Sequence, residues 1–121
     1  MTAKRPLCVT IMSREFPPNV YGGAGVHVDY LASSLASMMP VEVRCFGQRE
    51  AAQNSLAVRG YDPWLELSRG SDPRLEKVLS PLSVDLALVR DPIASGVVHC
   101  HTWYTFFAGY LAKLLYGVKL V

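Results

Sequence analysis

The sequence lacks any long apolar run, although half of its 121 residues are hydrophobic. No stretch approaches the ~20 consecutive apolar residues that a transmembrane helix needs. The first apolar run, Leu7 to Met12, is also too short for a signal peptide or a membrane span. We therefore expect a soluble protein with no membrane partner.

Cysteine is scarce as well. The three cysteines, Cys8, Cys45 and Cys100, each lie within an apolar run, and none forms a CxxC pair. An odd number of thiols in apolar runs is typical of packing roles in a reducing compartment, not of disulfides. A metal site would need ligands closer together in the sequence. We expect a cytoplasmic protein without a metal site.

Neither sign of charge dominates, because 12 basic and 10 acidic residues leave a net charge of only +2. No basic stripe stands out, which argues against a nucleic-acid partner. The length and the hydrophobic content suit a single domain, residues 1–121, with a sizeable core.

Apolar runs and helical spacings alternate along the first half. A strand is predicted at 7–12, a helix at 26–39 ended by Pro40, and a second strand at 41–46. Such a strand–helix–strand unit is right-handed in nearly all proteins. Residues 48–54 are polar and are expected at the surface, whereas 56–61 fit a third, short strand.

The second half repeats this alternation. Asp72-Pro73 is a helix start signal, and Ser80-Pro81 repeats it, so we expect a helix that breaks or restarts there. Residues 83–89 alternate partly like a strand, but the better strand candidate at 96–101 favours helix for them. A helix over 103–116 and a strand from Val118 complete an α/β fold. We expect a Rossmann-like parallel sheet in the order 3-2-1-4-5 with flanking helices.

A glycine-rich segment, Gly22-Gly23-Ala24-Gly25, lies between the first strand and the first helix. Glycine lets main chain approach a ligand, and a helix N-terminus there favours an anion. A dinucleotide fingerprint fits poorly, because Val28 occupies the place of its third glycine and the loop from Ser13 to Tyr21 is too long. No GxxxxGK[ST] motif is present. A glycine-rich connection without a ligand remains an alternative.

The segment HCHTW follows the strand at 96–101. His99 and His101 should point to one face, but His27, the only other histidine, belongs to the opposite strand–helix unit, which argues against a metal. Either histidine could simply pack and hydrogen-bond main chain. Alternatively, His101 and Thr102 contact sugar hydroxyls and Trp103 stacks on a sugar ring, although Trp103 suits the core equally well.

Taken together, SREFPPNVYGGAGVHVDYLASSLA and GVVHCHTWYTFFAGYLAKLLYGVKLV resemble the N-terminal domain of a GT-B glycosyltransferase. More narrowly, they resemble the retaining glycogen synthases of the actinobacterial type. The resemblance implies two Rossmann-like domains, with a nucleotide sugar, ADP-glucose or UDP-glucose, bound between them. It implies an α-1,4-glucan or glucose 1-phosphate as acceptor, retention of configuration, and no metal or other cofactor.

The resemblance also assigns roles to residues. The main chain at Gly22 and Gly23 would approach the donor phosphates. The residues expected to line the sugar and acceptor cleft are Glu15, Tyr21, His101, Thr102 and Trp103. A large group of bacterial glycogen synthases has lysine and threonine where this chain has Val20 and Tyr21, and aspartate at Thr102. These differences indicate the related group that handles glucans or maltose 1-phosphate.

The family's histidine beside the transferred sugar would follow the strand that begins at Val118. We therefore expect a partial, apparently truncated N-terminal domain with no catalytic residue of its own and no transfer activity alone. An unpaired edge strand at 118–121 would favour a homodimer. The alternative is a stand-alone Rossmann-like module that binds a nucleotide or phosphate.

Overall fold

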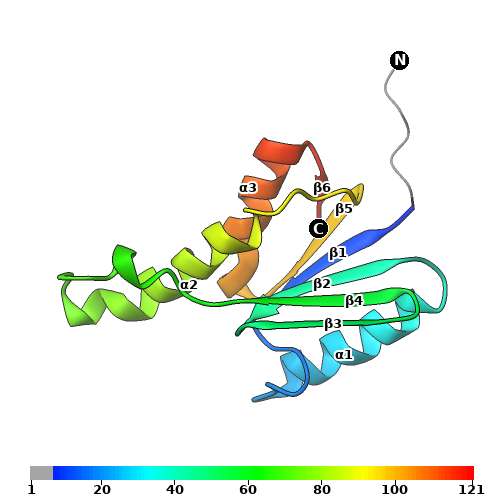
Figure 1. Cartoon of the computed structure of the whole chain (residues 1–121), viewed down its shortest axis with the longest axis horizontal. Coiled ribbons are helices and arrows are strands. Elements are labelled where there is room, and N and C mark those ends of the chain that lie inside the picture. The colour runs from blue at the N-terminus through cyan, green and yellow to red at the C-terminus, as the bar shows by residue number, and fades with distance from the viewer. Residues whose placement is uncertain (1–6) are drawn as a thin grey trace.

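One six-stranded sheet with helices on both faces forms the fold (Figure 1). The computed structural model describes residues 7–121. Its strands are β1 (Val9–Ser13), β2 (Val41–Phe46), β3 (Arg49–Gln53), β4 (Leu56–Tyr61), β5 (Val97–His101) and β6 (Lys119–Leu120). Its helices are α1 (Gly23–Ala36), α2 (Glu76–Leu88) and α3 (Phe106–Tyr116), with short 3-10 turns η1 (Leu65–Leu67), η2 (Pro73–Leu75) and η3 (Trp103–Thr105). No helix within residues 7–121 is long and apolar enough to cross a membrane.

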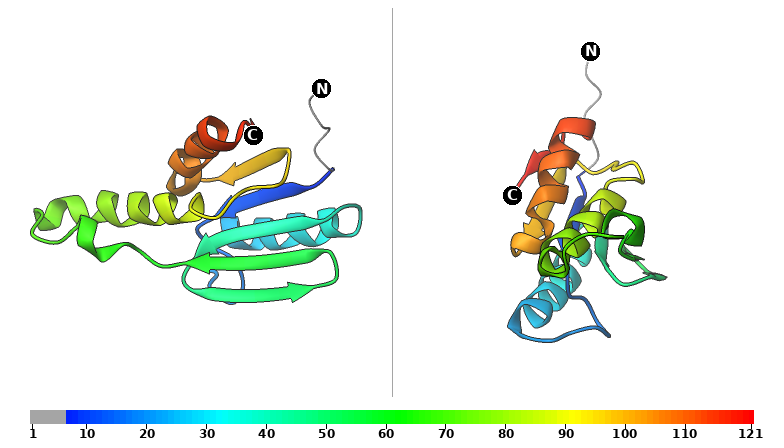
Figure 2. Two further views of the ribbon diagram at one scale, coloured as in Figure 1. Left: turned by 45° about the horizontal axis from the view of Figure 1, so that its top comes forward. Right: turned by 90° about the vertical axis from the view of Figure 1, so that its left-hand side faces the viewer.

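The strand order is β3-β4-β2-β1-β5-β6. The five strands other than β3 are parallel and lie in the order β4-β2-β1-β5-β6. Because β3 was not among the predicted strands, this is the predicted order 3-2-1-4-5, and it confirms the Rossmann-like α/β fold. In the left-hand view of Figure 2, β3 points opposite to its neighbour β4, and α1 passes behind the strands.

Residues 48–54 lie at the surface, as predicted, but they also contain the antiparallel edge strand β3, which was not predicted. The residues of β3 are mostly exposed and show no apolar alternation, so the sequence gives no strand signal. The two-residue turn Asn54-Ser55 joins β3 to β4, and Asn54 adopts a positive φ of 53°. Tertiary pairing with β4 therefore creates this strand.

Two cores lie on the two faces of the sheet. Val28 and Ala32 of α1 pack with Ile11 and Val43 on one face. On the other face, α2 and α3 contribute apolar residues that pack against Met12, Val98 and neighbouring residues. A Cβ at Gly109 of α3 would lie 2.4 Å from the Cys100 sulfur, so glycine allows α3 to approach β5 closely. β1 is buried along its whole length because both cores cover it.

Two helix predictions need correction. α1 begins at Gly23 and ends at Ala36, three residues earlier at each end than predicted. α2 continues through Pro81 without a break. Pro81 has no N–H to donate to the Lys77 carbonyl, and both residues border a surface cavity. The predicted helix at 83–89 is confirmed in α2, which ends at Leu88.

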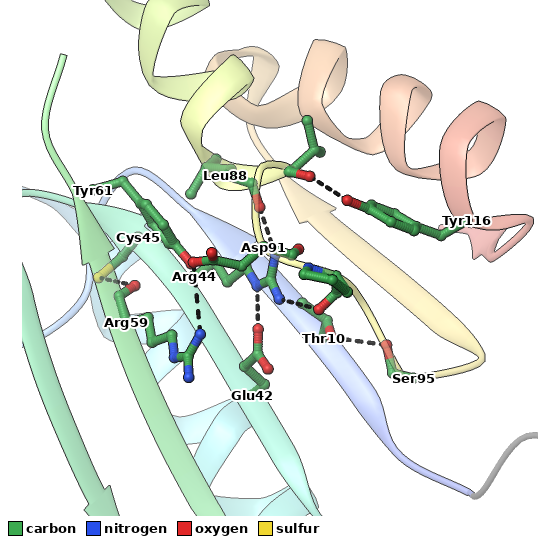
Figure 3. A network of polar contacts seen from close by, with 12 residues as sticks. Thr10, Glu42, Arg44, Cys45, Arg59, Tyr61, Leu88, Asp91, Ser95 and Tyr116 are labelled. Atoms are coloured by element: carbon green, nitrogen blue, oxygen red, sulfur yellow. Dashed lines mark hydrogen bonds and ion pairs between the residues drawn. The ribbon is translucent and has the colours of Figure 1, made fainter. Parts of the chain in front are cut away.

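The buried guanidinium of Arg44, with 1% of the residue exposed, joins β2 to the end of α2 (Figure 3). Its Nη1 donates to the carbonyl oxygens of Leu88 and Asp91, at 2.7 Å each, and its Nη2 donates to that of Pro92 at 2.9 Å. Its Nε donates to the carboxylate of Glu42 on the same strand. Arg44 thus supplies donors to the carbonyl of Leu88, which the end of α2 leaves without a helical partner, and to two carbonyls of the connection that follows.

Three further hydrogen bonds hold the connection between α2 and β5. Tyr61 donates to Asp91 Oδ2 at 2.8 Å, and Tyr116 donates to the carbonyl of Val89 at 2.5 Å. The hydroxyls of Thr10 and Ser95 lie 2.7 Å apart. Strands β1, β2 and β4 and helix α3 therefore all fix the same connection.

Asp85 is a buried carboxylate on α2, with 1% of the residue exposed. Neither of its oxygens has a hydrogen-bond partner of good geometry among the described residues. Burial raises its pKa to about 7, and the main-chain N–H of Ala108, near the start of α3, opposes this shift only weakly. Asp85 therefore binds a proton more readily in the folded chain than in the unfolded chain.

We expect Arg44→Met to lower the free energy of unfolding by about 3–5 kcal/mol, because the substitution leaves the Glu42 carboxylate and the three main-chain carbonyls without their buried donor. Arg59→Met is the matched control: Arg59 is half exposed and lies 3.6 Å from Asp91, so its loss should cost less than about 1 kcal/mol. Urea unfolding of the three proteins measures both values, and equal losses would contradict the role of Arg44.

The stability of the chain should also depend on the ionisation of Asp85. Because its pKa is higher in the folded state, its contribution is present below about pH 4 and is lost as the pH rises through about 7. Asp85→Asn should remove this decline. Urea unfolding at a series of pH values measures the slope, and the same slope in both proteins would disprove the effect.

Candidate functional site

The carboxyl ends of the parallel strands lie at one edge of the sheet. Ser13 at the end of β1 pairs in register with Cys45 of β2 and with His101 at the end of β5. The loop after β1 and the turn η3 after β5 therefore start side by side. In Figure 1 the N-terminal half of α2 projects beyond this same edge. Ligands of open α/β sheets bind at such an edge.

The Glu15 carboxylate organises the glycine segment. Its Oε1 accepts a hydrogen bond from the main-chain N–H of Tyr21 at 2.7 Å, and its Oε2 accepts one from that of Gly25 at 2.9 Å. Gly22, at the N-cap of α1, supplies no side chain, so the carboxylate caps the helix from outside. Glu15 was predicted to contact a sugar, but both of its oxygens already bind main chain of the loop.

The glycines of this segment differ in what surrounds them. A Cβ at Gly25 would lie 2.9 Å from the Glu15 Cβ and 3.0 Å from Val20 Cγ1. A Cβ at Gly22 or Gly23 would meet nothing within 4 Å. Packing therefore requires glycine at position 25, whereas Gly22 and Gly23 face open space at the N-terminus of α1, which attracts anions.

The turn after β5 is held by Thr105, which sequence reasoning missed. Its buried hydroxyl lies within hydrogen-bond distance of the carbonyl oxygens of His101 at 3.1 Å and of Met12 and Thr102 at 3.3 Å. Thr102 has a positive φ of 66°, an unusual backbone conformation for this residue type. No pattern in the sequence marks Thr105, because its acceptors come from two strands.

Trp103, Tyr104 and Arg14 form a stack at the surface of this edge. The Trp103 ring lies 4.2 Å from the Tyr104 ring at an interplanar angle of 29°, and Trp103 remains 50% exposed. The Arg14 guanidinium lies 4.4 Å from the centre of the Tyr104 ring and 5.9 Å from that of Tyr21, which is 76% exposed. Trp103 is thus available to a ligand.

Two cavities meet at this stack. The smaller one, of about 170 Å³, lies between the first turn of α1 and the turn after β5, and its lining includes Ala24 and Thr102. The larger one, of about 670 Å³, extends toward α2, and its lining includes Trp103 and Phe46. Arg14 and Tyr104 border both cavities.

The three histidines come together, contrary to the expectation that His27 lies apart. The His101 ring is 4.4 Å from that of His99 and 5.5 Å from that of His27. α1 starts at the carboxyl edge, so its second turn still lies near the end of β5. No group of three metal-ligating side chains within residues 7–121 has a geometry that could hold a metal ion.

His101 is held as a neutral imidazole. Burial, together with smaller contributions from its neighbours His99 and His27, lowers its pKa to about 4. Its Nε2 is buried and has no hydrogen-bond partner among the described residues. His101 packs among the histidines and does not line either cavity, whereas Thr102 lines the smaller one and Trp103 the larger one.

Comparison with known proteins matches residues 21–121 to the family model for Glycosyltransferase Family 4. The chain is 47% identical over 113 residues to an alpha-maltose-1-phosphate synthase of Mycolicibacterium smegmatis. It is 42% identical over 116 residues to an alpha-maltose-1-phosphate synthase of Mycobacterium tuberculosis. Each match covers 93% of this chain and 27% of the relative, so the chain spans about a quarter of the length of these curated relatives.

We expect Gly25→Ala to destabilise the chain, because the added methyl group would press on Glu15 and Val20 beneath the loop. Overpacking of this kind costs about 1–3 kcal/mol. Gly23→Ala is the control, because its methyl group would enter open space at a helical position, where alanine costs nothing. Thermal unfolding compares the two variants, and hydrogen exchange at the amides of Tyr21 and Gly25 reports the order of the loop. Equal stability of both variants would contradict the packing role of Gly25.

Proposed function

The chain belongs to glycosyltransferase family 4, and from this premise we propose that it forms one wall of the substrate cleft in an enzyme that makes maltose 1-phosphate. The observation that carries the proposal is the 42% and 47% identity, over 93% of the chain, to relatives named alpha-maltose-1-phosphate synthase. The proposed reaction moves glucose from ADP-glucose or UDP-glucose to glucose 1-phosphate with retention of configuration. An α-1,4-glucan is the alternative acceptor.

The donor diphosphate is proposed to lie in the smaller cavity, against the first turn of α1. The first N–H groups of a helix have no partner within the helix, and they carry the positive end of its dipole. Gly22 and Gly23 leave open space there, so phosphate oxygens can approach the main chain. Negative charge grows on the diphosphate as its bond to the anomeric carbon breaks. The N–H groups of Gly23 and Ala24 are proposed to stabilise that charge, since that of Gly25 donates to Glu15.

The acceptor is proposed to lie in the larger cavity. Its aromatic lining, Trp103, Tyr104 and Phe46, offers ring faces and edges to the apolar faces of a sugar. The lining also contains charged groups, such as Asp62 and Lys77, that can bind polar groups of an acceptor. The two cavities share the wall made by Arg14 and Tyr104, so an acceptor hydroxyl can lie next to the donor.

The rest of the cleft is proposed to come from parts of the protein beyond the matched region, since the match covers only 27% of each relative. We accordingly propose that the 121-residue chain alone does not transfer glucose. The neutral His101 is assigned no role in proton transfer, because it is buried among its neighbours.

A chimera tests the proposal. In the M. smegmatis relative, the segment that matches this chain is replaced by the matching 113 residues of this chain. We expect the chimera to form a phosphorylated disaccharide from ADP-glucose and glucose 1-phosphate. Gly23→Ala in the chimera should raise the KM for the nucleotide sugar about tenfold, equivalent to about 1.4 kcal/mol, without changing its melting temperature.

Radiolabelled transfer to glucose 1-phosphate and to maltooligosaccharides, measured in parallel, identifies the acceptor. A folded chimera that elongates only maltooligosaccharides would contradict the proposed acceptor. Turnover by the 121-residue chain alone would disprove the need for the rest of the cleft.

A further inference from the structure

Arg14 is a cation without an ionic partner at the meeting point of the two cavities. It follows directly after β1, and it makes no ion pair with any residue in the range 7–121. Four arginines in the same range have such partners: Arg44 pairs with Glu42, Arg59 with Asp91, Arg69 with Glu66 and Arg74 with Asp72. Arg49 and Arg90 also lack an ion pair within this range, but neither borders the smaller cavity. The charge of Arg14 is therefore free to meet a ligand.

The neighbouring carboxylate forms no ion pair with this guanidinium. Glu15 is next in sequence, but its two oxygens accept hydrogen bonds from the main-chain N–H groups of Tyr21 and Gly25. The same carboxylate therefore fixes the glycine segment, and the guanidinium next to it stays unpaired. The smaller cavity is lined by Arg14, by Glu15 and by the first turn of α1. A diphosphate there would meet the guanidinium and the positive end of the helix dipole, while the Glu15 carboxylate is bound to main chain.

Aromatic rings hold the guanidinium in place. It lies 4.4 Å from the centre of the Tyr104 ring, and Tyr104 is in turn stacked on Trp103 and meets Phe46 edge-on at 6.4 Å. A cation over an aromatic face keeps its N–H groups free at its edges, whereas an ion pair would occupy them. The stack therefore orients Arg14 and leaves its donors free.

We propose that Arg14 is the side chain that binds the diphosphate of the nucleotide sugar in the smaller cavity, with Tyr104 as its positioning residue. This inference rests on the proposed function, since it assigns the donor to that cavity. A guanidinium can donate two parallel hydrogen bonds to phosphate oxygens, and it remains charged at every physiological pH. As the bond between the anomeric carbon and the diphosphate breaks, the electron pair goes to the diphosphate oxygen, beside this fixed charge.

Binding of ADP and of pyrophosphate to the 121-residue chain tests the assignment without requiring transfer activity. Calorimetric titration of the wild-type chain is compared with Arg14→Gln, with Arg14→Lys and with Arg59→Gln, which removes the same charge from an exposed position on β4. We expect Arg14→Gln to weaken both ligands at least tenfold, Arg14→Lys to weaken them less, and Arg59→Gln to change either affinity by less than twofold. Tyr104→Leu should also weaken ADP binding, because it keeps Arg14 but removes the ring that orients its guanidinium.

Adenosine serves as the ligand without phosphate, and its affinity should be unaffected by any Arg14 substitution. Equal affinities of wild type and Arg14→Gln for ADP, or no ADP and pyrophosphate binding by the wild-type chain at millimolar concentration, would overturn the assignment. In the chimera, Arg14→Gln should raise the KM for ADP-glucose and lower kcat, with the KM for glucose 1-phosphate unchanged. A chimera that uses a different acceptor but keeps this response would contradict the proposed reaction and leave the role of Arg14 intact.

Discussion

The buried guanidinium of Arg44 is the interaction on which the shape of the candidate site depends. Its donors reach three carbonyls in the segment 88–92, where α2 ends and the chain turns toward β5. The end of α2 is thereby tied to the centre of the sheet, and its beginning projects beyond the carboxyl edge (Figure 1). That projecting half supplies the outer wall of the larger cavity. The Arg44 contacts at the end of α2 thus help to shape the larger cavity at the carboxyl edge of the sheet.

The loop after β1 contains some residues that stabilise the fold and others that face the cavities. The Glu15 carboxylate and the crowded Gly25 fix the loop against the start of α1. Gly22 and Gly23 face open space at the start of α1, and Arg14 borders the smaller cavity, where the donor phosphates are proposed to lie. Glycines that look alike in the sequence therefore have different roles: Gly25 is required by packing, whereas Gly22 and Gly23 leave open space. Only their contacts in the structure distinguish these roles.

Most of the sheet could be predicted from the sequence, because buried parallel strands are continuous apolar runs and the helices between them carry apolar faces at helical spacing. β3 could not, because its residues are polar and its strand conformation depends on pairing with β4. The continuity of α2 through Pro81 was also missed. The pair Ser80-Pro81 reads as a helix start, but proline can also lie inside a helix when the loss of one main-chain hydrogen bond is tolerated. The sequence does not distinguish these two cases.

For the site, the sequence by itself determined the two segments that matter, the glycine-rich loop and the HCHTW segment, because strand ends and helix starts leave local signals. It also determined the family, since both segments belong to one pattern. Only the tertiary structure decided which residues meet. In the structure, His27 lies next to His99 and His101, and the Glu15 carboxylate accepts hydrogen bonds from main-chain N–H groups. Arg14 stacks on Tyr104 where the two cavities meet. These outcomes depend on side chains from separate strands and helices that converge at one edge, and no local pattern records that convergence.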